Sequence, residues 1–171
     1  MKKGDVVFIL LVILPIVSSI INDDIITGRD TQEYGIKTEF VDYESVTANS
    51  LFNASPTRGI TDIVNIAFMT NSNYDAGLIR MRDYIFVPNG VLPSNRIVYK
   101  YLEVYHPEIP IDDIVSSRLI FRVPISWIQE NEYNPSRIVL QKYEAYSWID
   151  MNTWLNRTDS DYYYYNADTL S

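Results

Sequence analysis

Short segments in which apolar and polar residues alternate recur along most of this chain of 171 residues. Such alternation places the apolar side chains on one face of a β-strand. Turns that contain Gly, Pro, Asn or Asp separate the segments at intervals of roughly 8 to 15 residues. The expected strands cover residues 36–43, 60–69, 78–87, 97–105, 118–123, 137–144, 148–151 and 162–167. The sequence therefore predicts an all-β fold, most simply an antiparallel β-sandwich, with one short α-helix near residues 126–132.

The helix is expected where a strand ends at a proline. Phe121 and Val123 alternate with a polar residue, as in a half-buried strand, and Pro124 lacks the N–H needed to continue a sheet ladder. Ser126 stands three residues before Gln129, which is the spacing of a capping box. The helix should therefore begin at Ser126.

Two apolar residues in the first turn, Trp127 and Ile128, are expected to hold this helix against the core, while residues 129–132 face water. Asn134 precedes Pro135, and a residue before proline disfavours helical backbone angles. The helix should therefore end within about two turns, and a further strand should follow it.

The motifs around this helix follow one another in a definite order from about residue 60 to residue 168. They are Tyr99-Lys100-Tyr101, Phe121-Arg122-Val123-Pro124, Ser126-Trp127-Ile128, Val139-Leu140, Lys142-Tyr143, Trp148, Thr153 and Tyr162-Tyr163-Tyr164-Tyr165-Asn166-Ala167. In this order and spacing the chain resembles the archaeal PGF-pre-PGF domain, a family of cell-surface proteins. The resemblance implies a β-sandwich located at the cell envelope, and no reaction is known for such domains.

The chain departs from the family pattern in two places. The family usually has Leu-Pro-Thr after the Trp, whereas this chain has Met151-Asn152-Thr153. The family also continues through Pro-Gly-Phe into a last strand, whereas this chain ends at Ser171 and is C-terminally truncated by comparison. Without that strand, the edge of the strand at residues 162–167 is expected to be unpaired and open to a strand from another chain.

Residues 1–21 have the shape of a signal peptide. Lys2-Lys3 precedes a long apolar run, and Ser18-Ser19 offers small residues for cleavage. As a helix the run is about 24 Å long, against a hydrocarbon layer of about 30 Å, so it is short for a membrane span. We expect cleavage and a mature start near Ile20, with an uncleaved N-terminal membrane anchor helix as the alternative.

A pilin-like leader is a third interpretation, in which the chain is cut after Gly4 and the apolar helix is retained in a filament core. Pro15 and the lack of an acidic residue at the usual place inside the helix argue against it. In each case the rest of the chain is exported. Residues 22–35 then form a linker, and residues 36–171 form the β-sandwich domain.

The composition limits the classes of partner. The formal net charge is −8 and the pI is near 4.5. A protein that binds nucleic acid needs a basic face, so we do not expect nucleic acid as a partner. The chain has no cysteine, so neither disulfides nor thiolate metal sites can form. A chain of this size buries enough surface to fold as one domain.

No catalytic constellation can be recognised in the sequence. His106 is the only histidine, it precedes Pro107 at a strand end, and it is expected to be structural. There is no G-x-S-x-G sequence and no Gly-rich phosphate loop. We therefore expect no enzyme activity, no cofactor and no metal.

Two polar features near the C-terminus have alternative interpretations. Asp159 and Asp161, with Asp150 and Asp168 nearby, offer the oxygen ligands that calcium prefers, but a polar hairpin turn is the simpler interpretation. The four tyrosines at 162–165 should place two rings on each face of a strand. One pair should fill the core, and the other should rim it or form a platform for a sugar or a partner.

Two asparagines are candidate glycosylation sites in an exported chain. Asn156 lies in Asn-Arg-Thr, and Asn53 lies in Asn-Ala-Ser, a poorer sequon because Pro56 follows it. Both are expected to be exposed.

These features together predict an exported archaeal cell-surface or envelope protein that acts as a non-catalytic structural or interaction module, adhesion-like in character. Its expected partners are other cell-surface proteins or envelope components, and it is membrane-associated if the N-terminal segment is not cleaved. The alternative from another class is a secreted carbohydrate-binding or carbohydrate-active protein. It requires a concave site lined by exposed tyrosines and, for a hydrolase, two carboxylates about 5 to 10 Å apart. A pilin-like subunit with a retained N-terminal helix is the third hypothesis.

Overall fold

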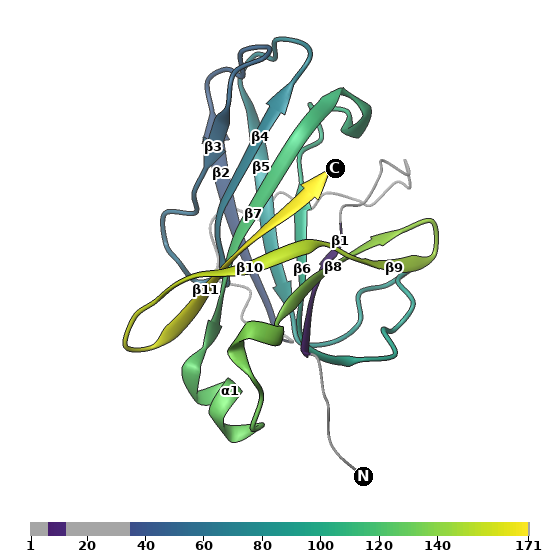
Figure 1. The fold of residues 1–171 in the computed structure, drawn as a ribbon. Helices are drawn as coiled ribbons and strands as arrows, with labels where there is room; N and C mark the ends of the chain where they lie inside the picture. Colours follow the sequence, from purple (N-terminus) through teal and green to yellow (C-terminus); the bar gives the residue numbers. More distant parts are fainter. Residues whose placement is uncertain (1–6, 13–34, 171) are drawn as a thin grey trace.

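The computed structural model describes residues 7–12 and 35–170 and shows two β-sheets that face each other, with one short α-helix at one end (Figure 1). The strands are β1 (Val7–Val12), β2 (Ile36–Tyr43), β3 (Phe52–Ala54), β4 (Ile63–Thr70), β5 (Gly77–Tyr84), β6 (Ile97–Tyr105), β7 (Ile114–Pro124), β8 (Val139–Glu144), β9 (Ser147–Asp150), β10 (Asn152–Thr158) and β11 (Tyr162–Leu170). The α-helix is α1 (Ile125–Glu130), and short 3-10 helices lie at Ile111–Asp113 and Pro135–Arg137. The predicted mainly-β fold with one short α-helix is confirmed in these residues.

The sheets differ in how their strands run. One has the order β2-β5-β6-β1-β8-β9, and the other has the order β10-β11-β7-β4-β3. Neighbouring strands are antiparallel except in the two pairs that include β1, which runs parallel to both β6 and β8. The predicted antiparallel arrangement therefore holds for every described pair of neighbouring strands except the two that include β1.

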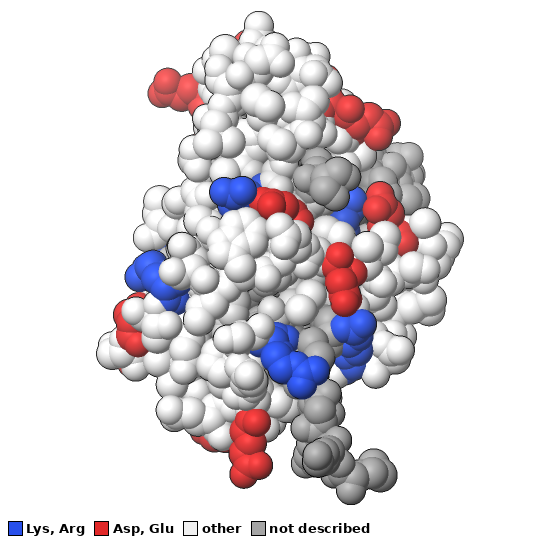
Figure 2. Space-filling model, viewed as in Figure 1, with Lys and Arg blue, Asp and Glu red and all other residues white. Residues whose placement is uncertain are grey.

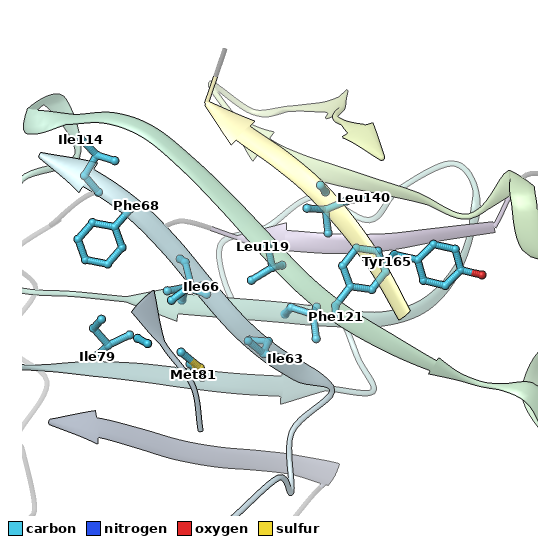
Figure 3. Packing of buried hydrophobic residues seen from close by; sticks show 14 of the residues in the cluster. Ile63, Ile66, Phe68, Ile79, Met81, Ile114, Leu119, Phe121, Leu140 and Tyr165 are labelled. Atoms are coloured by element: carbon cyan, nitrogen blue, oxygen red, sulfur yellow. The ribbon is translucent and has the colours of Figure 1, made fainter. Parts of the chain in front are cut away.

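The hydrophobic core lies between the two sheets, and Figure 3 shows its packing. The largest fully buried side chains are Tyr165, Phe68, Phe121, Ile63, Ile79, Met81, Leu102 and Ile109. The ring of Phe121 on β7 stacks on that of Tyr165 on β11, with centroids 5.3 Å apart. Phe121 and Val123 are both fully buried, as their alternation in the sequence predicts.

α1 begins one residue earlier than predicted, at Ile125. Pro124 occupies the N-cap position and no side chain caps the helix, so the predicted capping box between Ser126 and Gln129 is wrong. The reason is that β7 pairs with β11 as far as Pro124, and the amide of Ile125 then donates to the carbonyl oxygen of Asp161 at 2.8 Å. Sheet pairing thus carries the chain directly from strand into helix.

The predicted attachment of α1 to the core is confirmed. Ile128 is buried, and Trp127 is half-buried against the rings of Tyr99 and Tyr133, with centroids 4.8 and 5.4 Å away. Residues 129–132 are exposed.

Two strands occupy stretches that were expected to be loops. β3 and β10 form the two edges of the five-stranded sheet, where exposed positions accept polar residues and the alternation in the sequence is weak. β10 pairs with β11, which pairs with β7 on its other side. The expectation that the tyrosine-rich strand has an unpaired edge is therefore wrong, because a strand of the same chain covers it.

The predicted signal or anchor segment, residues 1–21, is described only at Val7–Val12. There the chain forms β1, a strand whose backbone pairs on both sides, where the sequence predicts a helix. The rest of that segment and the predicted linker up to residue 34 lie outside the described residues. In the described part of the chain, no helix has the length and apolar character needed to span a bilayer.

Candidate functional site

β1 fills a slot between two strands of the six-stranded sheet. β6 pairs with β5 on one side and β8 pairs with β9, and β1 joins these two halves of the sheet (Figure 1). The parallel register places Phe8 beside Val98 on β6 and beside Val139 on β8. We call the space between β6 and β8 the β6–β8 slot.

The strands that border the slot also form the core. Leu102 on β6 and Leu140 on β8 are 1% and 0% exposed. A strand in the slot therefore completes two backbone ladders. Main-chain hydrogen bonds supply much of the affinity when a strand is added to a sheet, whatever the source of the strand.

A group of charged side chains is buried where the two sheets meet beside α1. We define the Lys100 cluster as Lys100, Asp62, Asp83, Tyr99 and Arg122. Asp83 lies on β5, Tyr99 and Lys100 lie on β6, Arg122 lies on β7, and Asp62 directly precedes β4. The cluster therefore connects the six-stranded sheet with the five-stranded sheet.

Asp62 receives hydrogen bonds from three side chains of the cluster. Lys100 Nζ is in direct contact with Asp62 Oδ2, and the Tyr99 hydroxyl donates to the same oxygen at 2.8 Å. Arg122 Nε donates to Asp62 Oδ1 at 3.4 Å. The guanidinium of Arg122 is held in place because it also donates to two carbonyl oxygens of the loop before β4, at 2.6 and 3.1 Å.

Asp83 is the second carboxyl group that contacts Lys100. Its Oδ2 accepts hydrogen bonds from Lys100 Nζ at 3.2 Å and from the amide of Asp62 at 2.8 Å. Its Oδ1 is buried and has no hydrogen-bond partner among the described residues. Burial raises the pKa of Asp83 to about 6, although the charge of Lys100 acts in the opposite direction. Burial by itself lowers the pKa of Lys100, but the two carboxylates outweigh it, so that this pKa is raised.

The charged groups at the centre of the cluster are shielded from water. The side chains of Asp62, Asp83 and Lys100 are 7%, 2% and 13% exposed. An amine and two carboxyl groups in contact can form a buried ion pair, or they can exchange protons and react with each other.

The sequence-based prediction contains only part of this cluster. The prediction names Tyr99, Lys100 and Arg122 as members of the family motifs. It does not name Asp62 or Asp83 as functional residues.

A signal for Asp83 is present in the sequence, because alternation places it on the same face of its strand as Ile79 and Met81. Asp62 gives a weaker signal, as a charged residue directly before a mainly apolar strand. Charged residues are rarely buried unless they are paired.

The two predicted glycosylation residues are both exposed. Asn156 lies on β10 and Asn53 lies on β3, at opposite edges of the five-stranded sheet. Each sequon is therefore located on an edge strand.

Trp148, which the motif order marks as structural, lies on β9 and is half-buried. Its ring packs against Tyr143 and Tyr101, with centroids 4.6 and 6.3 Å away. Its indole N–H donates to the carbonyl oxygen of Leu92 at 2.8 Å. Trp148 thus holds the loop before β6 against the end of the six-stranded sheet.

His106 is buried at the end of β6. Its Nδ1 lies 2.7 Å from the carbonyl oxygen of Ile109, and its ring packs 6.2 Å from that of Phe68. Burial lowers the pKa of His106. No group of described residues is arranged to hold a metal ion.

The predicted polar turn before Tyr162 is confirmed. Asp159 Oδ1 accepts hydrogen bonds from the amides of Asp161 and Tyr162, at 2.9 and 2.8 Å. Asp159 Oδ2 accepts from the hydroxyl of Tyr164 at 2.6 Å. Both carboxylate oxygens of Asp159 therefore accept hydrogen bonds that stabilise the hairpin between β10 and β11.

The four tyrosines of β11 are divided between the two faces of the sheet. Tyr163 and Tyr165 pack in the core. On the other face, the guanidinium groups of Arg122 and Arg157 cover the rings of Tyr162 and Tyr164, at 4.5 and 3.6 Å from their centroids. The outer pair is therefore covered by arginines instead of forming a bare aromatic platform.

The surface formed by the described residues bears on the carbohydrate hypothesis. Figure 2 shows acidic and basic side chains interspersed over one face. A hollow at the end of α1 is lined by Ile97, Glu130, Asn131, Glu132, Tyr133, Asn134 and Arg137. The one tyrosine of this hollow, Tyr133, packs its ring against Trp127. The carbohydrate hypothesis requires a concave site lined by several exposed tyrosines, and this hollow does not meet that requirement.

Comparisons of the chain with protein-family models, with curated proteins and with solved structures found no match. The resemblance to the PGF-pre-PGF domain therefore stays a prediction that depends on motif order. The β6–β8 slot and the Lys100 cluster are the structural features from which function can be inferred.

Proposed function

We propose that the chain is an exported archaeal cell-surface protein, a non-catalytic module of PGF-pre-PGF type that binds other envelope proteins through the β6–β8 slot. The observation that supports this proposal is the position of the apolar segment Val7–Val12 inside a sheet. The same segment belongs to the predicted signal peptide. In a given molecule this segment is either cleaved off as part of the leader or retained as β1.

Removal of the leader leaves the slot open for another strand. One edge of β6 and one edge of β8 then lack backbone partners, and unpaired edges recruit further strands. An extended apolar segment of a neighbouring envelope protein, or of a second copy, restores both ladders. The module would thus join neighbouring proteins by strand addition, without chemistry.

Exposure of the two sequons supports the exported location. Asn156 and Asn53 are both accessible at the surface of the folded chain. Glycosylation of such residues requires that the chain pass the enzymes that export pathways provide. The sequons and their exposure are therefore both compatible with an exported protein.

Protease treatment of intact archaeal cells tests export. Cells that produce the full chain with a C-terminal tag are treated with proteinase K, and the tag is followed by immunoblot. We expect the tag to disappear from intact cells while a cytoplasmic protein survives. A chain that lacks residues 1–19 is the matched control and should stay protected. Degradation of the full chain only after lysis would contradict export.

The N-terminus of the cell-surface form tests the open slot. We expect mass spectrometry of the surface protein to find a start near Ile20, which leaves the slot free for another strand. A surface form that retains residues 7–12 would supply its own β1. That result would contradict strand acceptance while leaving export intact.

A further inference from the structure

We propose that Lys100 and Asp62 form an intramolecular isopeptide bond, with Asp83 as the proton-transfer residue. The geometry of the Lys100 cluster carries this inference, and it requires only that the two sheets fold together. It is therefore independent of export and of the β6–β8 slot.

The amine and the carboxyl group are already adjacent. Lys100 Nζ contacts Asp62 Oδ2, so the nitrogen lies next to Cγ, the carbon that carries this oxygen. Holding two reacting groups in this way replaces an encounter in solution and is worth an effective concentration of about 10⁵–10⁸ M when the geometry is favourable. Amide formation from an amine and a carboxylate, which is slow in water, is assisted by such contact.

Two further side chains polarise the carboxyl group of Asp62. The Tyr99 hydroxyl donates to Oδ2 and Arg122 Nε donates to Oδ1. These donors withdraw electron density from Cγ and stabilise the negative charge that develops on oxygen when nitrogen attacks. The site is also buried, which strengthens these interactions and limits the access of water.

Asp83 is placed to move the proton. Its Oδ2 lies 3.2 Å from Lys100 Nζ, and its Oδ1 is a buried acceptor without a partner among the described residues. Its pKa, raised by burial to about 6, lets it exchange a proton near neutral pH.

The reaction balances without any further reagent. The Lys100 ammonium gives one proton to the Asp83 carboxylate, and the neutral amine attacks Cγ of Asp62 to form the C–N bond. The nitrogen then loses a second proton, and one Asp62 oxygen takes up both protons as its C–O bond breaks. The products are an amide and one molecule of water, and Asp83 ends as it began.

Removal of buried charge favours the product. An ammonium and a carboxylate in a protein interior each lose the hydration that they have in water, and their mutual attraction often fails to repay it. The amide that replaces them carries no net charge. In a chain without cysteine, this bond would connect the segment before β4 to β6, and hence one sheet to the other.

The mass of the folded wild-type chain tests the bond directly. We expect the denatured protein, with its N-terminus determined, to weigh one water molecule less than its sequence requires. Trypsin should release residues 59–80 and 97–118 as one branched peptide, uncleaved at Lys100. The full sequence mass, with these residues recovered as separate peptides, would overturn the proposal and leave only an ion pair.

Variants assign the three roles. Lys100→Arg keeps the positive charge and should show the full sequence mass. Lys142→Arg is the matched control, because Lys142 is also buried and pairs with Glu144 at 3.2 Å, and it should keep the loss of water. If Lys100→Arg fails to fold, the wild-type peptide map decides alone.

The two aspartates are distinguished by their amide variants. Asp62→Asn should lose one ammonia instead of one water, because the leaving group changes while the attacked carbon stays the same. Loss of water in Asp62→Asn would show that Lys100 reacts with another carboxyl group and would overturn the assignment. Asp83→Asn should retain its full mass, and bond formation at the wild-type rate would overturn the role of Asp83.

Discussion

Burial changes the chemistry of single residues in this protein, and His106 is a simple case. Its pKa lies below the ordinary value of 6.5 because of burial, while contacts with the carbonyl oxygen of Ile109 and the charge of Glu108 act in the opposite direction. The unfolded chain therefore binds a proton at a higher pH than the folded chain does. Stability due to neutral His106 is present above pH 6.5 and is lost as the pH falls toward the folded pKa.

We expect the free energy of unfolding to decrease as the pH is lowered from about 7 to about 5, in part because of His106. Urea unfolding at several pH values measures this free energy. In His106→Gln the decrease should be smaller. Parallel pH profiles of the two proteins would show that His106 titrates alike in the folded and unfolded chains.

Phe121 is a residue whose role follows from both the sequence and the structure. It is fully buried on β7 and stacks on Tyr165 of the same sheet. We expect Phe121→Ala to lower the free energy of unfolding by about 3–5 kcal/mol, because it removes buried contacts and leaves a cavity. Val115→Ala on the same strand is the control, since Val115 is 43% exposed, and it should change stability by less than about 0.5 kcal/mol. Equal effects in chemical denaturation would contradict this assignment of the core.

At the scale of strands and helices, alternation identified the longer strands that bury one face better than short or mostly exposed strands. The sequence pattern placed β2 and β6 at the bounds that the structure has. It missed β10, because most of its residues are exposed, and it missed β3, because a strand of three residues is too short to show a period. It also expected a helix across Val7–Val12, since an apolar run has no period that separates a helix from a buried strand.

Contacts between distant segments were not readable from the sequence. Asp62 and Lys100 become neighbours only because the two sheets pack against each other, and local patterns carry no information on that packing. The same holds for the start of α1, which depends on a hydrogen bond from the backbone N–H of Ile125 to the carbonyl oxygen of Asp161. The motifs included Tyr99, Lys100 and Arg122 but neither aspartate of the Lys100 cluster, and tertiary structure brings all five residues together.

The position of β1 can be tested by disulfide trapping, because the chain has no cysteine of its own. Phe8 and Val139 are register partners on β1 and β8, and adjacent strands bring paired residues within disulfide range. We expect oxidised Phe8→Cys/Val139→Cys to form an intrachain disulfide in the full-length protein. A mixture of the two single variants should form an interchain disulfide if strands are exchanged between copies.

The control for trapping is a pair out of register. Phe8→Cys combined with Glu144→Cys should form little disulfide, because Glu144 lies at the far end of β8 from Val139. Non-reducing gels and mass spectrometry distinguish intrachain from interchain products. Equal trapping of both pairs would contradict the parallel register of β1.

At the scale of the whole molecule, the two edges of the five-stranded sheet are places where a further strand could pair. β3 and β10 are these edges, and each carries one exposed sequon asparagine. β10 also has a register irregularity between Leu155 and Arg157, and such bulges discourage further strand pairing. A glycan on each edge would block edge-to-edge contact between copies.

We expect loss of both sequons, through Ser55→Ala and Thr158→Ala, to increase self-association of protein purified from its native cells. Light scattering over a concentration series measures this association. The control is the same pair of proteins produced in a host without N-glycosylation, where the difference should vanish. An unchanged molar mass of the native-cell variant, with glycan loss verified, would contradict a protective role of the glycans.

Asp62 precedes a strand of one sheet and Lys100 lies in the other, so a covalent bond between them would limit how far the chain extends under tension. Residues 63–99 would remain a closed loop that a pulling force cannot straighten. At about 3.3–3.6 Å per extended residue, this removes roughly 120 Å from the stretched length of the chain. A protein that connects a cell to a moving neighbour would then lengthen less when it unfolds under tension.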